Sequence, residues 1–351
     1  MLVGACRRLP GRPSGWRSRR RFPRLVTVKT TTVGRSGLQV SRIAFGTWSF
    51  GGDWGSVDTD AAQNAIRYAR ELGVNFFDTA QGYGNGTAEE ILGDALRSEL
   101  DAHRDEIVIA TKGGIDPGAE RSRNSGREFL RSGVESSLRA MKIEYIDLYQ
   151  VHWPDPQTPF EDTAGYLQEL VDEGKIRHDG VSNYDVAQME AFERGRPVET
   201  LQPPYHLFRR SVEAEIWPYV QTHDIGVLVY SPLGSGLLTG AMTEDTTFDD
   251  GDWRSQASAF TGEGFRTNLA VVEKLKEFAA GKGIEVSQLA IAWVLAQPEV
   301  DVAIVGARSR RNIERSLAAV DVELDAADLA EIDHITMDGF EVQGATPEGV
   351  D

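Results

Sequence analysis

The chain has 351 residues, 40% of them hydrophobic, and a formal net charge of −17. That apolar content is ample for a globular core. No apolar run reaches the ~18 residues of a membrane span. A protein with this negative charge repels the phosphodiester backbone of nucleic acids. We therefore expect neither a membrane nor a nucleic-acid partner, and the single cysteine, Cys6, excludes an internal disulfide framework and favours a reducing, cytoplasmic location.

The first 27 residues differ in composition from the rest. Residues 1–24 hold eight arginines and no acid, so the remainder of the chain carries about −25 once those eight charges are removed from −17. An Arg-rich head without acids is typical of a mitochondrial transit peptide, but its Pro and Gly residues disfavour an amphipathic helix. The alternative is a disordered tail or a misassigned start. We place residues 1–27 outside the fold.

After a hairpin-like lead at Thr30–Gly37, strand-like runs alternate with helix-like segments. We expect strands at 42–46, 75–79, 107–111, 146–151, 176–181, 199–202, 226–230 and 301–305. This alternation indicates βα units in a parallel sheet, and eight strands close a barrel. The sequence therefore predicts an α/β fold, a (β/α)8 TIM barrel, as a single domain over residues 28–340. Residues 341–351 form a polar C-terminal tail.

Several loops are bounded by helix-start signals. Thr87–Glu90 and Ser125–Glu128 have the spacing of capping boxes, and Pro159 is expected at the first position of a helix. The longest irregular stretch is 234–266. Loops of this length in compact domains are usually functional, so we expect this one to fold over a cofactor, with a variable surface insertion as the alternative.

Four polar residues end or follow three successive strands, at the rim where a (β/α)8 barrel holds its chemistry. They are Asp78, Tyr83, Lys112 and His152. Each has a structural explanation when taken alone. Asp78 suits a helix N-cap and Lys112 a solvated surface lysine. His152 suits a satisfied core histidine, and Tyr83 could cover the barrel rim. Their joint occurrence at these positions predicts a catalytic site.

Reducing a carbonyl requires a hydride on carbon and a proton on the developing alkoxide. A free phenol, with a pKa of about 10, is a weak acid at neutral pH. A cation beside its oxygen stabilises the phenolate. Lys112 can supply that cation, Asp78 can hold Lys112 by an ion pair, and His152 can donate a hydrogen bond to the substrate oxygen.

Six motifs carry a family resemblance. They are Phe77-Asp78-Thr79-Ala80 with Tyr83-Gly84, Ala110-Thr111-Lys112, Asp147-Leu148 before His152, Gly180-Val181-Ser182-Asn183, Tyr230-Ser231-Pro232-Leu233-Gly234 and Ile304-Val305-Gly306-Ala307-Arg308. Between about Lys29 and Glu341 the chain resembles a bacterial, broad-specificity aldo-keto reductase. The resemblance implies NADPH-dependent reduction of an aldehyde or ketone, with Tyr83 as proton donor, Lys112 and Asp78 as its tuning pair, and His152 orienting the carbonyl.

No dinucleotide-binding G-x-G-x-x-G follows a strand, since the nearest approach, at 234–239, fails at its last glycine. A Rossmann dehydrogenase is therefore disfavoured. The resemblance instead assigns cofactor contacts to Thr47, Trp48, Ser182, Asn183, Gln202, Tyr230, Ser231, Leu233, Gly234, Gly306, Arg308, Arg311 and Asn312. Asn312 stands where related sequences have Gln or Arg, and Arg311 is a candidate to compensate. Arg308 suits a 2′-phosphate, so NADPH is preferred and NADH stays open.

The predicted substrate is a small-molecule carbonyl in a pocket walled by Trp48 and Trp153. Phe50, Trp54 and Tyr205 are further candidates, with plain rim packing as the alternative. No histidine pair has metal-ligand spacing, so no metal is expected. Two other functions stay open: an NADPH-binding regulatory subunit without significant turnover, and an alcohol or sugar dehydrogenase using the same residues in reverse. The oligomeric state is also open.

Overall fold

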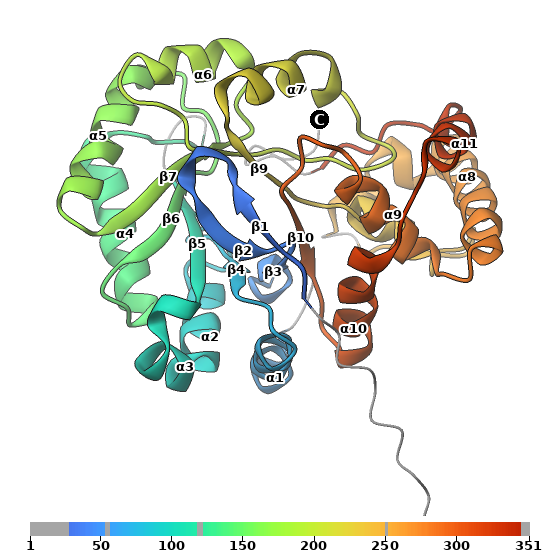
Figure 1. Cartoon of the computed structure of the whole chain (residues 1–351), viewed down its shortest axis with the longest axis horizontal. Coiled ribbons are helices and arrows are strands. Elements are labelled where there is room, and N and C mark those ends of the chain that lie inside the picture. Colours follow the sequence, from blue (N-terminus) through green and yellow to red (C-terminus); the bar gives the residue numbers. More distant parts are fainter. Residues whose placement is uncertain (1–27, 53–56, 118–121, 250–251, 345–351) are drawn as a thin grey trace, which may run out of the picture.

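The computed structural model describes residues 28–52, 57–117, 122–249 and 252–344, so the basic head and Trp54 lie outside the described residues. Eight strands form a closed barrel in the order β10-β3-β4-β5-β6-β7-β8-β9 (Figure 1), and every ladder is parallel. The strands are β3 Ile43–Gly46, β4 Phe76–Asp78, β5 Val108–Gly113, β6 Ile146–Val151, β7 Ile176–Ser182, β8 Thr200–Gln202, β9 Gly226–Val229 and β10 Val302–Gly306. The predicted (β/α)8 barrel is confirmed, and all eight predicted strands are found within two residues at each end.

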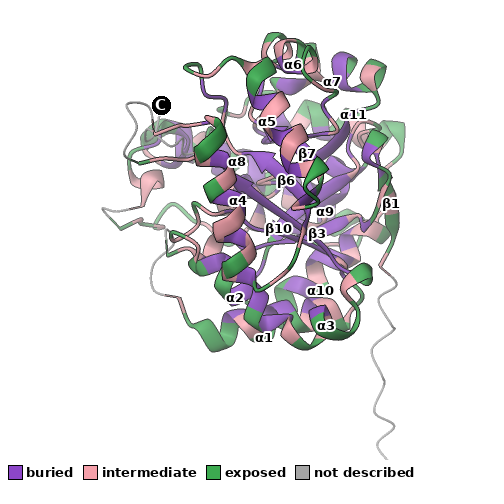
Figure 2. Ribbon diagram, turned by 90° about the vertical axis from the view of Figure 1, so that its left-hand side faces the viewer, coloured by how far each residue is buried: buried purple, intermediate pink, exposed green. Residues whose placement is uncertain are grey.

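Eleven α-helices within the described residues surround or extend the barrel. They are α1 Thr59–Glu71, α2 Thr87–Ala95, α3 Arg97–Ala102, α4 Arg127–Met141, α5 Phe160–Asp172, α6 Val186–Glu193, α7 Val212–His223, α8 Gly262–Gly281, α9 Val286–Leu295, α10 Arg310–Ala318 and α11 Ala326–Thr336. Figure 2 shows buried strands in the centre and exposed residues on the outer faces of the helices. The larger apolar cluster lies between strands and helices, and a smaller one fills the barrel interior.

The predicted hairpin lead is present as β1 (Thr30–Val33) and β2 (Leu38–Ser41), paired antiparallel. Its Val33 and Val40 are fully buried and belong to the interior apolar cluster of the barrel. Gly34 has a φ of +37°, and a Cβ there would lie 2.2 Å from the backbone nitrogen of Gly226, where β9 begins. The hairpin thus closes the end of the barrel at which strands begin, and the opposite rim is left for a site.

Neither predicted capping box forms. The Thr87 hydroxyl donates 2.7 Å to the carbonyl of Gly84 instead of accepting from the first turn of α2. Helix α4 has Gly126 as its N-cap, and Ser125 lies outside the helix with its backbone N–H bound to Asp155. Pro159 is the N-cap of α5 and not its first helical residue.

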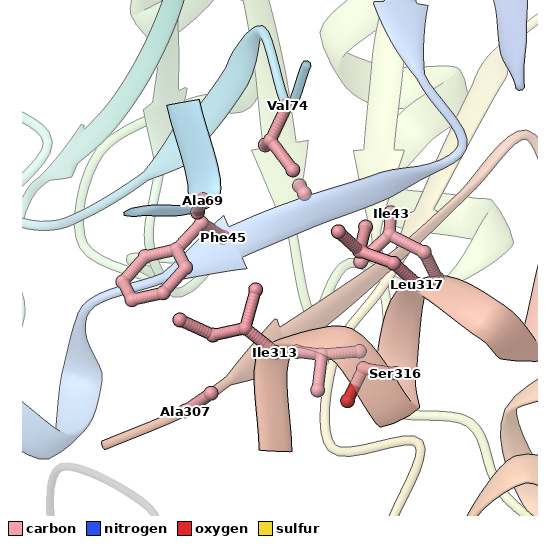
Figure 3. A pocket seen from close by; sticks show the side chains of 10 residues that line it. Ile43, Phe45, Ala69, Val74, Ala307, Ile313, Ser316 and Leu317 are labelled. Carbon is pink, nitrogen blue, oxygen red and sulfur yellow. The ribbon is translucent and has the colours of Figure 1, made fainter. Parts of the chain in front are cut away.

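One packing gap lies outside the barrel, between β3, α1 and α10 (Figure 3). It measures about 10 Å³ and is lined by apolar side chains such as Phe45, Ile313 and Leu317. That is about the space of a single water, which would lack polar partners on most sides. The gap is therefore a packing defect and not a ligand site.

In the part of the chain that the structure describes, no single helix is long and apolar enough to cross a membrane. The helices α8 and α9 reach the required length and hydropathy only as a pair, and they meet at a bend of 86°.

Candidate active site

Lys112 and Asp78 form an ion pair at the strand-end rim of the barrel. Lys112 lies on β5 and Asp78 ends the neighbouring strand β4. The Lys112 Nζ donates to Asp78 Oδ1 at 2.7 Å and to the carbonyl of Thr79 at 2.8 Å, and it lies 3.5 Å from the Tyr83 hydroxyl. Asp78, Lys112 and Tyr83 are thus joined in one chain of contacts.

Burial decides the character of Lys112. Its side chain is 0% exposed, so the surface-lysine alternative is wrong. Burial lowers the pKa of Lys112, and the negative charge of Asp78 opposes that shift. A buried ammonium needs such a partner, because an unpaired charge in a low-dielectric interior is costly. Asp78 supplies it and, as a strand residue, is not a helix N-cap.

The second carboxylate oxygen of Asp78 binds across the barrel. Gln202 Nε2 donates to Asp78 Oδ2 at 3.0 Å and approaches Gln150 Oε1 at 3.3 Å. Asp78 therefore accepts from Lys112 on one oxygen and from Gln202 on the other. A cofactor contact by Gln202, as predicted, would share the Gln202 amide with Asp78.

His152 follows β6 directly and is aimed at Tyr83. Its backbone N–H donates to the carbonyl of Gly113 at 2.9 Å. Its ring meets the Tyr83 ring edge-on, with centroids 5.7 Å apart. Burial, and then the charge of Lys112, lowers the pKa of His152 well below its ordinary value, so the ring is neutral at neutral pH. Its Nδ1 has no hydrogen-bond partner among the described residues, unlike a satisfied core histidine.

A cavity of about 910 Å³ opens above this group. The predicted residues that line it are Trp48, Asp78, Tyr83, His152, Trp153, Ser182, Gln202, Tyr230, Ser231, Leu233, Gly306, Arg308 and Asn312. This volume lies at the upper end of ordinary small-molecule sites. Lys112 does not line the cavity because it lies beneath Tyr83 and Asp78.

Four predicted cofactor residues do not line the cavity. Thr47 is fully buried behind it, with a hydroxyl that has no partner in the described part of the chain. Asn183 and Gly234 lie next to lining residues. Arg311 is 79% exposed and its closest carboxylate is that of Glu285, at 3.9 Å. Arg311 lies on α10 next to the lining residue Asn312, and its role at the cofactor stays a prediction.

A polar network fixes the end of β7. Asn183 has a φ of +63°, and its amide donates to the carbonyl of His152 and to the Ser182 hydroxyl, both at 3.0 Å. The Tyr230 hydroxyl donates to Asn183 Oδ1 at 2.9 Å. The network ties β6, β7 and the end of β9 together, so that Ser182 and the Tyr230 ring face the cavity in fixed positions.

The segment after β9 bends tightly along the cavity. Ser231, Gly234, Ser235 and Gly236 all have positive φ, between 52° and 99°. The predicted long loop continues from here and supplies further lining residues, Thr239, Trp253 and Arg254. Sequence reasoning missed Trp253 and Arg254.

Arg254 holds the long loop against the segment after β9. Its Nη1 donates to the carbonyl of Ser235 at 3.0 Å, and its guanidinium is paired with Asp252. The available signal was a cation and a tryptophan in an otherwise acidic, Gly-rich loop, which does not by itself distinguish a cavity wall from a surface insertion.

Arg308 and α10 form the far end of the cavity. Arg308 Nη2 donates to the carbonyl of Ser49 at 3.1 Å, so the loops after β10 and β3 are joined. Ser309 is the N-cap of α10 and accepts from the backbone N–H of Asn312. A helix N-terminus beside a guanidinium is a suitable place for a phosphate. Among the described residues, no group of three or more His, Cys, Asp or Glu side chains could hold a metal ion.

The aromatic candidates for the pocket divide into two groups. Trp48 and Trp153 line the cavity. Phe50 and Tyr205 do not: both are buried, and Tyr205 packs against Trp217 and Trp293 with ring centroids 5.1 Å apart in each case. The pocket role considered for Phe50 and Tyr205 is therefore wrong, because their rings are taken up by core packing.

Comparison with known proteins agrees with the geometry of the site. A model of the aldo/keto reductase family matches residues 42–336. The chain belongs to the aldo/keto reductase family. The resemblance noted from the motifs is confirmed, and the chain is an oxidoreductase of that family.

Individual relatives cover nearly the whole fold. Aldo-keto reductase YhdN of Bacillus subtilis (strain 168) is 40% identical over 308 residues, 87% of this chain and 92% of its own. The glycerol dehydrogenase AKR11B4 from Gluconobacter oxydans has a TM-score of 0.79 at 37% identity, covering 89% of this chain and 95% of its own. An aldo-keto reductase from Klebsiella pneumoniae, solved in complex with NADPH, has a TM-score of 0.70 at 30% identity, covering 88% and 95%.

Proposed function

We propose that this aldo/keto reductase reduces an aldehyde or ketone to an alcohol with NADPH, and that Tyr83 gives the proton. The observation that carries the proposal is the line of contacts from Asp78 Oδ1 through Lys112 Nζ, 2.7 Å away, to the Tyr83 hydroxyl 3.5 Å further on. This line ends at a large cavity, so a phenol with a buried ammonium behind it faces the space for a substrate.

The proton transfer follows from this arrangement. As negative charge develops on the carbonyl oxygen, the Tyr83 O–H donates its proton there and becomes a phenolate. The Lys112 ammonium stabilises that phenolate from the buried side. His152 is neutral, so it has one ring N–H and can donate to the same oxygen without carrying a proton away.

The cavity suits a nicotinamide cofactor, which supplies the hydride when bound. Ser182 and Gln202 face it from β7 and β8, and the Tyr230 ring offers an apolar face. The segment Ser231–Gly236 and the N-terminus of α10 offer backbone donors to phosphates. Arg308 favours the extra phosphate of NADPH, and the NADPH complex of the Klebsiella pneumoniae relative supports this choice. NADH is the second candidate.

The proposed substrate is a small carbonyl compound between Trp48 and Trp153. Oxidation of an alcohol would use the same groups in reverse, with a Tyr83 phenolate as base, and the relationship to a glycerol dehydrogenase favours testing it. We place the enzyme in the cytoplasm, and we propose no role for nucleic acid or membranes.

The first experiment follows NADPH consumption with 4-nitrobenzaldehyde for the wild-type protein and the Tyr83→Phe variant. We expect turnover in the wild type and a loss of ~10²-fold or more in Tyr83→Phe, with NADPH affinity within ~3-fold, the effect of one ordinary hydrogen bond. The control is Tyr166→Phe, on α5 away from the cavity. Equal turnover in Tyr83→Phe would refute the assigned acid. NADPH binding without wild-type turnover over a broad carbonyl panel would favour the regulatory-subunit alternative.

A further inference from the structure

A second carboxyl lies behind Lys112, on the outside of the barrel. Glu89 belongs to α2 and is only 1% exposed. It accepts a hydrogen bond of 2.6 Å from the Thr111 hydroxyl. Thr111 immediately precedes Lys112 on β5, and successive side chains of a strand point to opposite faces. Lys112 therefore points into the barrel towards Asp78, while Thr111 points outwards to Glu89.

Close packing fixes the position of α2 and hence of Glu89. A Cβ at Gly93 of α2 would lie 2.6 Å from the carbonyl oxygen of Met141, where α4 ends. The side of α2 that carries Glu89 is thus held against α4 and the barrel. In Figure 1, α2 and α4 lie beside β5 on the same side of the barrel.

The groups that act on Glu89 or lie near it come from three elements. Lys112 and Thr111 belong to β5, Tyr149 to β6, and Ser137 to α4. The Tyr149 hydroxyl has no hydrogen-bond partner within the described residues. Burial raises the pKa of Glu89, whereas the hydrogen bond from Thr111, the nearby Ser137 hydroxyl and the charge of Lys112 lower it. Lys112 is the cation in this group.

Glu89 in turn affects the protonation of Lys112. The negative charges of Asp78 and Glu89 both raise the pKa of Lys112 against the larger effect of its burial. Asp78 does so by direct contact from inside the barrel, and Glu89 acts through the wall. Facing Lys112 on the inner side are also the Tyr83 hydroxyl and the neutral His152. One ammonium therefore lies between two carboxyls.

We propose that Glu89 is a positioning residue for the reduction: its carboxyl, on the outer side of β5, keeps Lys112 charged behind Tyr83. A polar residue that merely filled the gap between α2 and β5 would need its hydrogen bond to Thr111 but not its charge. This inference rests on the proposed function, because it assigns Glu89 to the proton-donating pair of that reaction.

The test is the pH profile of kcat for NADPH-dependent reduction in Glu89→Gln, which keeps the size and removes the charge. A negative charge nearby raises the proton affinity of Lys112 and Tyr83, so its loss lets both deprotonate at lower pH. We expect the basic limb of the profile to move down by ~0.5 unit or more. Glu89→Asp should restore the limb. Glu90→Gln, the same change at the exposed neighbour on α2, should leave it in place.

Folding is checked by circular dichroism and NADPH binding. If Glu89→Gln does not fold, Glu89→Met provides the test, because it also removes the charge at similar size and the limb should move the same way. An unmoved basic limb in these variants, with or without a uniform fall in kcat, would overturn the role of Glu89. Absence of wild-type turnover, or full activity in Tyr83→Phe, would instead refute the proposed function itself.

Discussion

The ion pair of Asp78 and Lys112 has a cost that pH can reveal. Lys112 is fully buried, and its Nζ lies 2.7 Å from Asp78 Oδ1. Asp78→Asn keeps the shape and removes the contacting negative charge. The ammonium must then either remain buried without that charge or lose its proton, and the cheaper of the two sets the cost.

The cost of deprotonating Lys112 sets an upper limit on the stability lost in Asp78→Asn. An unfolded lysine has a pKa of about 10.5, and each unit costs about 1.4 kcal/mol. Deprotonation therefore costs ~5 kcal/mol at pH 7 and ~2 kcal/mol at pH 9. Breaking a buried pair usually costs ~3–5 kcal/mol. We expect Asp78→Asn to lower the free energy of unfolding by ~3–5 kcal/mol at pH 7, and by ~2 kcal/mol at most at pH 9.

The direction of this pH dependence follows from the linkage between proton binding and folding. A lysine whose folded pKa is depressed destabilises the fold below its unfolded pKa, and the penalty fades as the pH rises towards that value. Urea unfolding, followed by tryptophan fluorescence at both pH values, measures the change. Asp94→Asn breaks the exposed pair with Lys142 and should cost ~1 kcal/mol or less at either pH. A loss in Asp78→Asn that does not depend on pH would refute the reasoning.

Three further predictions concern the cofactor end and the packing. Arg308→Gln should weaken NADPH binding by ~10-fold or more while leaving NADH within ~3-fold, measured by fluorescence titration; equal losses would contradict a 2′-phosphate contact. Tyr230→Phe removes the hydrogen bond to Asn183 and should weaken binding of either cofactor by ~3–10-fold in the same titration. Unchanged binding would show that this bond has no part in shaping the site. Gly113→Ala would place a Cβ 1.9 Å from the Tyr149 hydroxyl and should destabilise by ~2 kcal/mol or more, whereas Gly165→Ala, with open space in α5, should stabilise by up to ~1 kcal/mol in thermal unfolding; equal effects would contradict the packing argument.

The barrel strands were predictable because they are buried on both faces. A strand such as Ile146–Val151 is buried at every position, so it appears in the sequence as a short run dominated by apolar residues. A polar residue that ends such a run stands out, as Asp78 does after Phe76 and Phe77. For the same reason, the grouping of Asp78, Lys112 and Tyr83 could be anticipated from strand order alone.

Helix starts were less predictable because their local pattern competes with distant partners. Ser125 has capping-box spacing, but Asp155, 30 positions away, accepts from its backbone N–H and fixes the chain just before α4. Thr87 turns to the carbonyl of Gly84 instead. Groups near a helix start bind the partner that folding brings within reach, and the sequence does not show which one that is.

The prediction of pocket aromatic residues was wrong in part, for a related reason. Tyr205 follows β8 and Trp253 begins a short 3-10 helix after β9, yet Tyr205 is enclosed by Trp217 and Trp293 while Trp253 lines the cavity. An aromatic side chain has a favourable place in either environment. The sequence therefore predicts that aromatic residues surround the rim but not which of them face a substrate.

The two oxygens of Asp78 explain why an aspartate suits this position. In the order of the barrel, β4 and β8 lie opposite each other, so the contact between Asp78 and Gln202 spans the interior. One oxygen accepts from Lys112, on the proposed proton-donating side, and the other accepts from Gln202, beside Ser182 on the proposed nicotinamide side. An asparagine would turn an N–H towards one of these two donors. A carboxylate is the side chain of this length that accepts from both, so it links the proposed proton-donating side to the proposed nicotinamide side.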